Sequence, residues 1–266
     1  MIIIGEKING SVPEVAAAIA GRDKKFIQEL ARVQAEAGAD FIDCCAAVLP
    51  EQEADTLKWM VECIQEVTDV PISLDSASPD VLSEVYGCCK CPGLFNSVSA
   101  EGRKLDKIFS IMAKEENKGW EVIALLLDEK GIPKTAGERL RLLDFIMEKA
   151  REYGIDSGRI HIDPLVEMLC ISEDGVSVTL EVISAVRAKY PKLHITGAIS
   201  NVSYQLPARR LLNTAFLVLA MQAGLDGAIL DPTNEERKGL IYATEALLGK
   251  DENCMEYIRA YRDGFA

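Results

Sequence analysis

The chain has 266 residues and carries 42 acidic against 29 basic side chains, for a formal net charge of −13. This length suits a closed α/β barrel, which needs about 250 residues. The acidic balance excludes a general nucleic-acid surface, because phosphate backbones attract basic side chains and repel acidic ones.

Membrane and secretory signals do not appear in the sequence. No apolar run approaches the roughly 18–20 residues that a membrane-spanning helix needs. The first residues, Met1–Glu6, lack the basic segment and long apolar segment of a signal peptide. Eight cysteines, several of them adjacent, suit a reducing compartment better than a disulfide framework. We therefore expect a cytoplasmic protein with no membrane segment.

Short apolar, β-branched runs alternate with helical patterns along the whole chain. Their spacing, about 20–40 residues, is that of a β-strand followed by a crossover helix. Continuous apolar character is typical of parallel strands buried on both faces. The runs predict eight strands, at Ile2–Ile4, Phe41–Ile42, Pro71–Leu74, Gly93–Phe95, Val122–Leu127, Arg159–Ile162, His194–Ile199 and Gly227–Leu230.

Helical signals fill the intervals between these runs. Phe26, Leu30, Val33 and Ala37 share one helical face, and Gly38 stands where a left-handed cap would end that helix. A second face repeats this spacing at Leu57, Met60, Val61 and Ile64.

Two helix starts and one last helix can also be predicted. Ser78 and Pro79 form an N-cap followed by a proline in the first turn. Thr135 and Glu138 have the spacing of a capping box, and a last helix is expected near Asn253–Arg262. No linker divides the chain, so we predict one domain, residues 1–266. Eight strand–helix units favour a (β/α)₈ TIM barrel over an open sheet, which stays possible.

Polar residues recur where the predicted strands end, and the active sites of such barrels lie at that end. Asp is also a good helix N-cap, so some of these residues can be structural. We interpret Asp128 and Asp231 as capping or loop residues. Asp75, Asn96 and Asp163 directly follow apolar runs and are better candidates for ligand contacts. The whole set is Glu6, Asp43, Asp75, Asn96, Asp128, Asp163, Ser200, Asn201 and Asp231.

Two kinds of ligand suit such a ring. A divalent metal would use carboxylates, often with histidine, but the only histidines, His161 and His194, lie inside predicted strands. His161 could share an inward face with Asp163, yet we expect no protein-bound metal. A flat heterocycle with an amidine-like edge, such as a reduced pterin, would also suit carboxylates and an amide.

The cysteines offer a weaker signal. Cys88, Cys89 and Cys91 precede a predicted strand, on the face opposite the polar ring, and no second paired motif accompanies them. We interpret them as structural or incidental thiols, and Cys44 and Cys45 as packing residues.

Five short motifs occur in chain order at the predicted strand ends, and together they extend over nearly the whole chain. The motifs are Gly5-Glu6-Lys7-Ile8-Asn9-Gly10, Leu74-Asp75-Ser76, Phe95-Asn96-Ser97, Ile162-Asp163-Pro164-Leu165 and Ser200-Asn201-Val202-Ser203. With these motifs the sequence resembles the methyltetrahydrofolate:corrinoid protein methyltransferases, a branch of the pterin-binding family that includes the folate domain of cobalamin-dependent methionine synthase.

The resemblance implies a homodimer that transfers a methyl group between N5 of tetrahydrofolate and the cobalt of a corrinoid. It implies that Asp75, Asn96 and Asp163 hold the pterin and that Asn201 hydrogen-bonds near N5, which makes Asn201 and Asp75 the catalytic candidates. Arg209 would lie at the pocket mouth. Glu6, Asp43 and Gln205 would support the network, Gln205 from the loop that runs from Asn201 to Arg209.

One segment departs from the family pattern. Relatives tend to have Asp-x-Asn-x-Gly after the second strand, where this chain has Asp43-Cys44-Cys45-Ala46-Ala47. Neither histidine stands in an Asp-x-His-x-x-Gly arrangement, so we expect the corrinoid on a separate protein. Three alternatives remain: a dihydropteroate synthase, whose first loop would differ from Asn9–Pro13, a metal-dependent aldolase, and a noncatalytic pterin carrier or corrinoid-protein partner.

Overall fold

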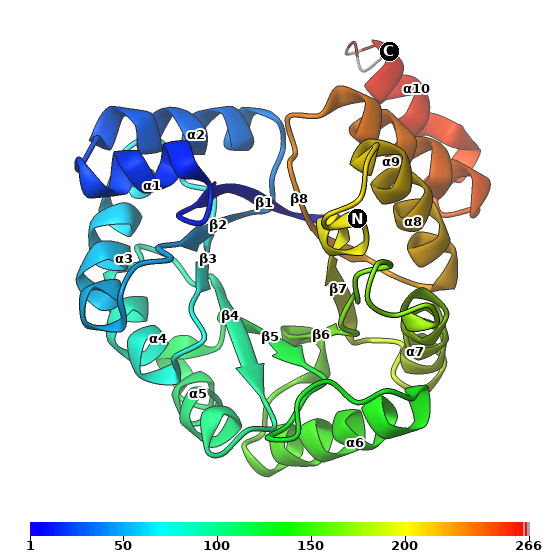
Figure 1. Ribbon diagram of the computed structural model, residues 1–266, viewed down its shortest axis with the longest axis horizontal. Coiled ribbons are helices and arrows are strands. Elements are labelled where there is room, and N and C mark those ends of the chain that lie inside the picture. The colour runs from blue at the N-terminus through cyan, green and yellow to red at the C-terminus, as the bar shows by residue number, and fades with distance from the viewer. Residues whose placement is uncertain (263, 265–266) are drawn as a thin grey trace.

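Eight parallel strands close into a barrel in chain order, which confirms the predicted (β/α)₈ fold. The computed structural model describes residues 1–262 and 264, and the helices form a ring around the strands (Figure 1). The strands are β1 (Ile2–Asn9), β2 (Phe41–Cys45), β3 (Ile72–Asp75), β4 (Leu94–Ser99), β5 (Glu121–Leu125), β6 (Ile160–Asp163), β7 (His194–Ala198) and β8 (Gly227–Leu230). β1 completes the closure, since Ile4 pairs with Phe41 of β2 on one side and with Ile229 of β8 on the other.

The helices that follow the strands cover the outside of the barrel. They are α1 (Pro13–Ala20), α2 (Lys24–Glu36), α3 (Pro50–Gln65), α4 (Pro79–Val85), α5 (Lys104–Met112), α6 (Ala136–Glu152), α7 (Gly175–Lys189), α8 (Arg209–Ala223), α9 (Glu235–Leu247) and α10 (Met255–Arg262). Short 3₁₀ turns occur at η1 (Tyr86–Cys88), η2 (Glu115–Asn117), η3 (Ser157–Arg159), η4 (Ile199–Ser203) and η5 (Glu252–Cys254). No described helix has the length and apolar character to cross a membrane.

The capping signals act as the sequence predicts. The Thr135 side chain accepts a hydrogen bond from the Glu138 N–H while the Glu138 carboxylate accepts from Thr135, which starts α6. Ser78 caps α4 through the Val81 N–H. Gly38 adopts φ +86° just after α2, where a left-handed residue ends a helix with least steric cost. The predicted last helix is confirmed as α10, although Asn253 precedes it with φ 55°.

Alternation along the strands divides the core into two regions. Ile160 and Ile162 of β6 belong to the large cluster between sheet and helices, so His161 and Asp163 face the barrel interior. Ile4, Leu94 and Ile123 form the smaller buried cluster inside the barrel, below the cavity described next.

The prediction that Glu6, Asp43 and Asn96 follow their strands is wrong in detail. Asn96 lies inside β4, which extends to Ser99. β1 extends to Asn9 and β2 to Cys45, because the register of these two strands continues through the pair Asn9–Cys45. Both acids therefore lie inside strands, near the carboxyl-terminal ends. β5 is shorter than predicted and ends at Leu125.

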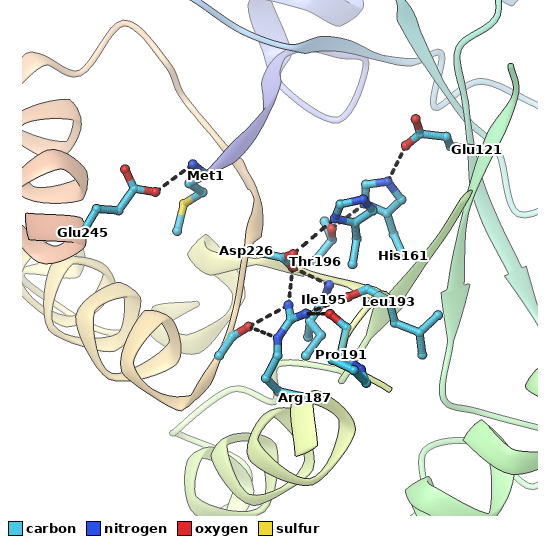
Figure 2. Close-up of polar contacts among 12 residues, drawn as sticks. Met1, Glu121, His161, Arg187, Pro191, Leu193, Ile195, Thr196, Asp226 and Glu245 are labelled. Carbon is cyan, nitrogen blue, oxygen red and sulfur yellow. Dashed lines mark hydrogen bonds and ion pairs between the residues drawn. The ribbon is translucent and has the colours of Figure 1, made fainter. Parts of the chain in front are cut away.

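The amino-terminal end of the barrel is closed by hydrogen bonds among polar side chains (Figure 2). The ring nitrogens of His161, which is fully buried, contact Thr196 Oγ1 at 2.8 Å and Glu121 Oε2 at 2.7 Å. Asp226 pairs with Arg187 at 2.9 Å and with His194 at 3.2 Å. This network satisfies charged groups that would be costly to bury alone.

Candidate functional site

A cavity of about 910 Å³ opens at the carboxyl-terminal ends of the strands. Seven of the eight residues that the resemblance assigns to the site line it together: Glu6, Asp43, Asp75, Asn96, Asp163, Asn201 and Arg209. Gln205 is not among the lining residues; it is exposed, with φ +62°.

Irregular pairing in two strands explains how adjacent residues come to share this cavity. The register of β1 shifts between Gly5 and Ile8, and both Glu6 and Lys7 line the cavity. The register of β4 shifts after Asn96, and both Asn96 and Ser97 line it. In a regular strand successive side chains point to opposite faces, and an extra residue in one strand breaks that alternation.

Asp43 forms the buried floor of the cavity. Its Oδ1 accepts hydrogen bonds from Ser73 Oγ at 2.6 Å and from Asn96 Nδ2 at 3.0 Å. Because the Asn96 amide group donates downward to Asp43, its carbonyl oxygen is left to accept a hydrogen bond from a ligand. Burial, and then the charge of Asp75, raise the pKa of Asp43 to about 8. The floor acid is therefore mainly protonated at neutral pH.

Asp75 lies beside Asp43 at the end of β3. Cys45 is its cross-strand neighbour on β2, and the Cys45 thiol hydrogen-bonds to the Asp75 carboxylate. Burial raises the pKa of Asp75, while this hydrogen bond opposes the shift. Cys45 therefore has a polar contact in addition to the packing role that we expected.

Asp163 ends β6 and is nearly fully buried, with 8% of its surface exposed. The Leu165 N–H donates to Asp163 Oδ1 at 2.7 Å. Burial raises the pKa of Asp163 to about 6, and the Leu165 hydrogen bond and the charge of Arg139 limit that shift. One carboxylate oxygen is therefore held by backbone, and the other remains for a ligand.

The mouth of the cavity is formed by the segment after β7. Asn201, in η4, is exposed and lines the cavity. Arg209, the first residue of α8, donates from Nη2 to the Ser200 carbonyl at 2.9 Å and from Nε to Ser203 Oγ at 3.1 Å. Ser200 Oγ in turn contacts Glu6 Oε2 at 3.4 Å, and burial raises the pKa of Glu6.

Asp128 and Asp231 differ more than the sequence suggests. Asp128 accepts a hydrogen bond from the Lys130 N–H and lies outside the cavity, which agrees with a loop role. Asp231 accepts from both the N–H and the hydroxyl of Thr233 through Oδ1. Its Oδ2 contacts Lys7 Nζ at 3.1 Å, and both residues line the cavity. Asp231 is thus a loop residue that also belongs to the site.

Several residues that line the cavity were not predicted from the sequence. Phe26 and Leu30 of α2 line it, but their helical spacing gave them only a core role. Lys7 lies in a quoted motif, yet only the irregular pairing of β1 turns it inward. Tyr204, with its ring 5.8 Å from the Arg209 guanidinium, stands at the mouth. No sequence pattern separates such rim aromatics from ordinary loop residues.

The two histidines and the cysteine cluster lie away from the cavity. His161 and His194 belong to the network at the amino-terminal end of the barrel. Cys88, Cys89 and Cys91 lie before β4, at that same end, and are free thiols. Within residues 1–262 and 264, no group of three or more His, Cys, Asp or Glu side chains is arranged to hold a metal ion.

The barrel and its cavity define the class of protein: a (β/α)₈ fold with an acid- and amide-lined pocket at the carboxyl-terminal ends of the strands. The chain belongs to the family of pterin binding enzymes, whose family model matches residues 16–231.

Two curated relatives narrow the comparison. The chain is 43% identical over 264 residues to a methylcorrinoid:tetrahydrofolate methyltransferase of Eubacterium limosum, which covers 99% of this chain and 97% of that protein. It is 28% identical over 245 residues to the methionine synthase of Mycobacterium tuberculosis, which covers 86% of this chain and 20% of that protein.

Solved structures share the fold at lower identity. Dihydropteroate synthase of Xanthomonas albilineans, solved with 4-aminobenzoic acid, superimposes with a TM-score of 0.63 at 19% identity and covers 94% of this chain and 93% of that one. The Coxiella burnetii enzyme, solved with pteroic acid, gives 0.63 at 20% identity and covers 92% and 94% of the two chains. These similarities establish the barrel and nothing about the reaction.

The segment after β2, whose sequence departs from the family pattern, contains a residue with a left-handed backbone conformation. Ala47 adopts φ +46°, a left-handed conformation that favours glycine. This is the position where relatives tend to have glycine. Alanine therefore stands in place of glycine, but the backbone at this position still adopts the conformation that favours glycine.

Proposed function

We propose that the chain is a methyltransferase that moves a methyl group between the cobalt of a corrinoid and N5 of tetrahydrofolate. The observation that carries the proposal is the identity of 43% over 99% of the chain to a relative named for that reaction. That name gives the methylcorrinoid as the methyl donor, so the first direction to test is transfer from the methylcorrinoid to tetrahydrofolate.

The cavity chemistry supports a pterin as the bound group. A pterin edge presents an amino group, a ring N–H and a carbonyl oxygen, and carboxylates accept from such donors in pairs. We propose that Asp75 and Asp163 accept from the ring and that the Asn96 carbonyl accepts beside them. Asp43 would then fix the orientation of the Asn96 amide through the contact at 3.0 Å.

The transfer itself is an in-line displacement. The N5 lone pair of tetrahydrofolate attacks the methyl carbon, and the carbon–cobalt bond breaks with its electrons passing to cobalt, which leaves cob(I)amide. N5 then loses its proton. Buried carboxyl groups with raised pKa, such as Glu6 and Asp75, can take up or return that proton through water. Asn201 would hydrogen-bond at N5 in the transition state, and Arg209 would hold the mouth.

We further propose that the corrinoid arrives on a partner protein that docks over the cavity. Five exposed apolar side chains support this, since each lies on a loop that follows a strand and so faces the side of the molecule with the cavity. They are Val12, Leu49, Ile132, Ile171 and Tyr204. Both histidines lie at the other end of the barrel.

Assembly and location follow as proposals. Exposed leucines on α8 and α9, Leu211, Leu219 and Leu247, offer an apolar surface for a second copy of the chain, and sedimentation analysis would show the expected dimer.

Eight free thiols suit the cytoplasm, and a net charge of −13 disfavours a nucleic-acid partner. We propose that residues 1–266 form one pterin-binding domain.

The decisive experiment is an anaerobic assay with methylcobalamin and tetrahydrofolate, which follows cob(I)alamin by absorbance and methyltetrahydrofolate by chromatography. Both products should appear in equal amounts. Absence of exchange in either direction, with free and with protein-bound corrinoid, would contradict the proposal. Folate binding without exchange would indicate a noncatalytic carrier. In a separate assay, dihydropteroate formed from 4-aminobenzoate and a dihydropterin pyrophosphate, with release of pyrophosphate, would indicate a synthase.

A further inference from the structure

Arg139 is a fully buried arginine at the start of α6, outside the cavity lining. A guanidinium group in a protein interior is costly unless its donors are satisfied. Arg139 Nε donates to the Pro133 carbonyl at 3.1 Å, and Nη1 donates to the carbonyls of Pro164 at 2.6 Å and Leu165 at 2.9 Å. Nη2 pairs with the Glu167 carboxylate. Four groups on two loops therefore converge on this one side chain.

The loop that Arg139 holds begins directly after Asp163. Leu165 adopts φ +64°, a left-handed conformation that is unfavourable for a branched side chain and persists only when its surroundings impose it. The Arg139 guanidinium donates to the Leu165 carbonyl at 2.9 Å, whereas the single hydrogen of the Thr179 hydroxyl is shared between the Gly175 carbonyl at 2.8 Å and the Leu165 carbonyl at 3.1 Å. Arg139 of α6 is therefore the main donor that holds the Leu165 peptide in place, and Thr179 of α7 adds a weaker contact.

The same residue, Leu165, sets the position of the Asp163 carboxylate. Its N–H donates to Asp163 Oδ1 at 2.7 Å, and Asp163 lines the cavity. A shift of the Leu165 peptide would move the oxygen that remains for a ligand. A path of direct contacts therefore runs from Arg139 through Leu165 to Asp163.

We propose that Arg139 is a positioning residue that aligns the Asp163 carboxylate for the pterin by fixing the Pro164–Leu165 backbone. This inference rests on the proposed function, since it takes the pterin as the ligand of Asp163. Arg139 also acts on Asp163 by charge. The other charged residues that line the cavity with Asp163 are the acids Glu6, Glu14, Asp43, Asp75 and Asp231 and the cations Lys7 and Arg209.

The barrel provides a matched control at its opposite end. Arg187 of α7 donates to the carbonyls of Pro191 at 2.9 Å, Leu193 at 3.0 Å and Gly224 at 3.1 Å, and it pairs with Asp226 (Figure 2). It is thus a second arginine that ties backbone carbonyls together, but it lies at the amino-terminal end, away from the cavity. Arg139→Lys and Arg187→Lys each keep the charge and lose the fork of donors.

The test compares these two variants by melting temperature and by anaerobic calorimetry with tetrahydrofolate between pH 5.5 and 8. We expect Arg139→Lys to weaken binding about tenfold at pH 7.5, the size of one displaced charge-assisted hydrogen bond. The pH at which affinity falls to half should also rise. Arg187→Lys should lower the melting temperature while affinity stays within about twofold of wild type. Unchanged affinity in Arg139→Lys, or equal losses in both variants, overturns the proposal.

Two further measurements keep the result decisive. If Arg139→Lys does not fold, Glu167→Gln removes the charge that pairs with Arg139 Nη2 and should weaken binding about threefold; unchanged affinity overturns the proposal. Carbon-13 titration of Asp163 in the ligand-free protein does not depend on folate. The retained positive charge does not hold the Leu165 peptide, so the Leu165 N–H bond to Asp163 should weaken in Arg139→Lys. The pKa of Asp163 should then rise above about 6, and an unchanged pKa overturns the inference. If wild-type protein does not bind tetrahydrofolate, the proposed function fails and this titration still decides the role of Arg139.

Discussion

The thiol of Cys45 hydrogen-bonds to the carboxylate of Asp75, its cross-strand neighbour in the barrel. Where relatives tend to have an asparagine, a weaker donor thus faces one of the acids expected to bind the pterin. Burial raises the pKa of the Cys45 thiol, and the charge of Asp75 raises it further. The thiol is therefore protonated at neutral pH and can donate.

Loss of that donor should weaken ligand binding. Cys45→Ala leaves Asp75 without its hydrogen bond, and we expect the dissociation constant for tetrahydrofolate to rise about fivefold, which corresponds to roughly 1 kcal/mol. Cys45→Asn supplies an amide donor and should restore or improve affinity. Anaerobic calorimetry at pH 7 measures both. Equal affinities in the alanine variant and wild type would show that this contact is only packing.

Asp43 should make the ligand-free protein less stable as pH rises. Its pKa is about 3.8 in the unfolded chain and about 8 in the fold, so the folded state binds the proton more tightly. The resulting stabilisation is complete below pH 3.8 and is lost as pH rises through 8. Asp43→Asn cannot ionise and should exceed wild type by on the order of 2 kcal/mol at pH 8.

Urea unfolding at pH 5 and pH 8 measures this difference. Asp128→Asn is the control, because Asp128 lies in a loop outside the cavity and its substitution should have the same small effect at both values. If the stability advantage of Asp43→Asn over wild type does not grow between pH 5 and pH 8, then Asp43 is not protonated in the folded protein.

Asn201 should matter more for rate than for binding. Its side chain lies at the exposed mouth of the cavity, and a hydrogen bond that strengthens as charge develops at N5 acts mainly in the transition state. Asn201→Ala should lower the single-turnover transfer rate about 100-fold or more and raise the folate dissociation constant less than about threefold. Losses of equal size would make Asn201 a binding residue.

Ala47 is a site where a substitution should stabilise the protein. Its φ of +46° costs an L-residue with a Cβ about 1 kcal/mol relative to glycine. Ala47→Gly should raise the melting temperature by about 2–4 °C. Ala46, the residue before Ala47, has no positive φ, so Ala46→Gly should lower the stability of the fold. A lower melting temperature in Ala47→Gly would mean that chain entropy outweighs the strain.

The sequence predicts the barrel and most of its polar ring because both depend on local patterns. Apolar runs mark buried parallel strands, and an acid at the end of a run such as Ile162–Asp163 must face either the cavity or a loop. Arg139 could not be recognised, because a basic residue in a helix usually faces solvent. Only the return of the Pro164–Leu165 backbone toward α6 buries it.

Phe26 and Leu30 illustrate the same limit. Their spacing indicates an apolar helix face, but whether that face packs on sheet or lines a cavity depends on where α2 lies along the barrel. The position of Lys7 in the cavity could not be predicted for a different reason. Strict alternation assigns Glu6 and Lys7 to opposite faces of β1, and only the shifted register brings both to the cavity.

The shifted register of β1 and β4 also constrains how this site can change by insertion or deletion. Removing one residue near Lys7 would restore regular alternation and send either Glu6 or Lys7 toward the helices, where an unpaired charge would be buried. Substitution at these positions, by contrast, leaves the backbone path intact. New ligand preferences can therefore arise here by exchange of side chains, whereas a change in the length of either strand would turn lining residues away from the cavity.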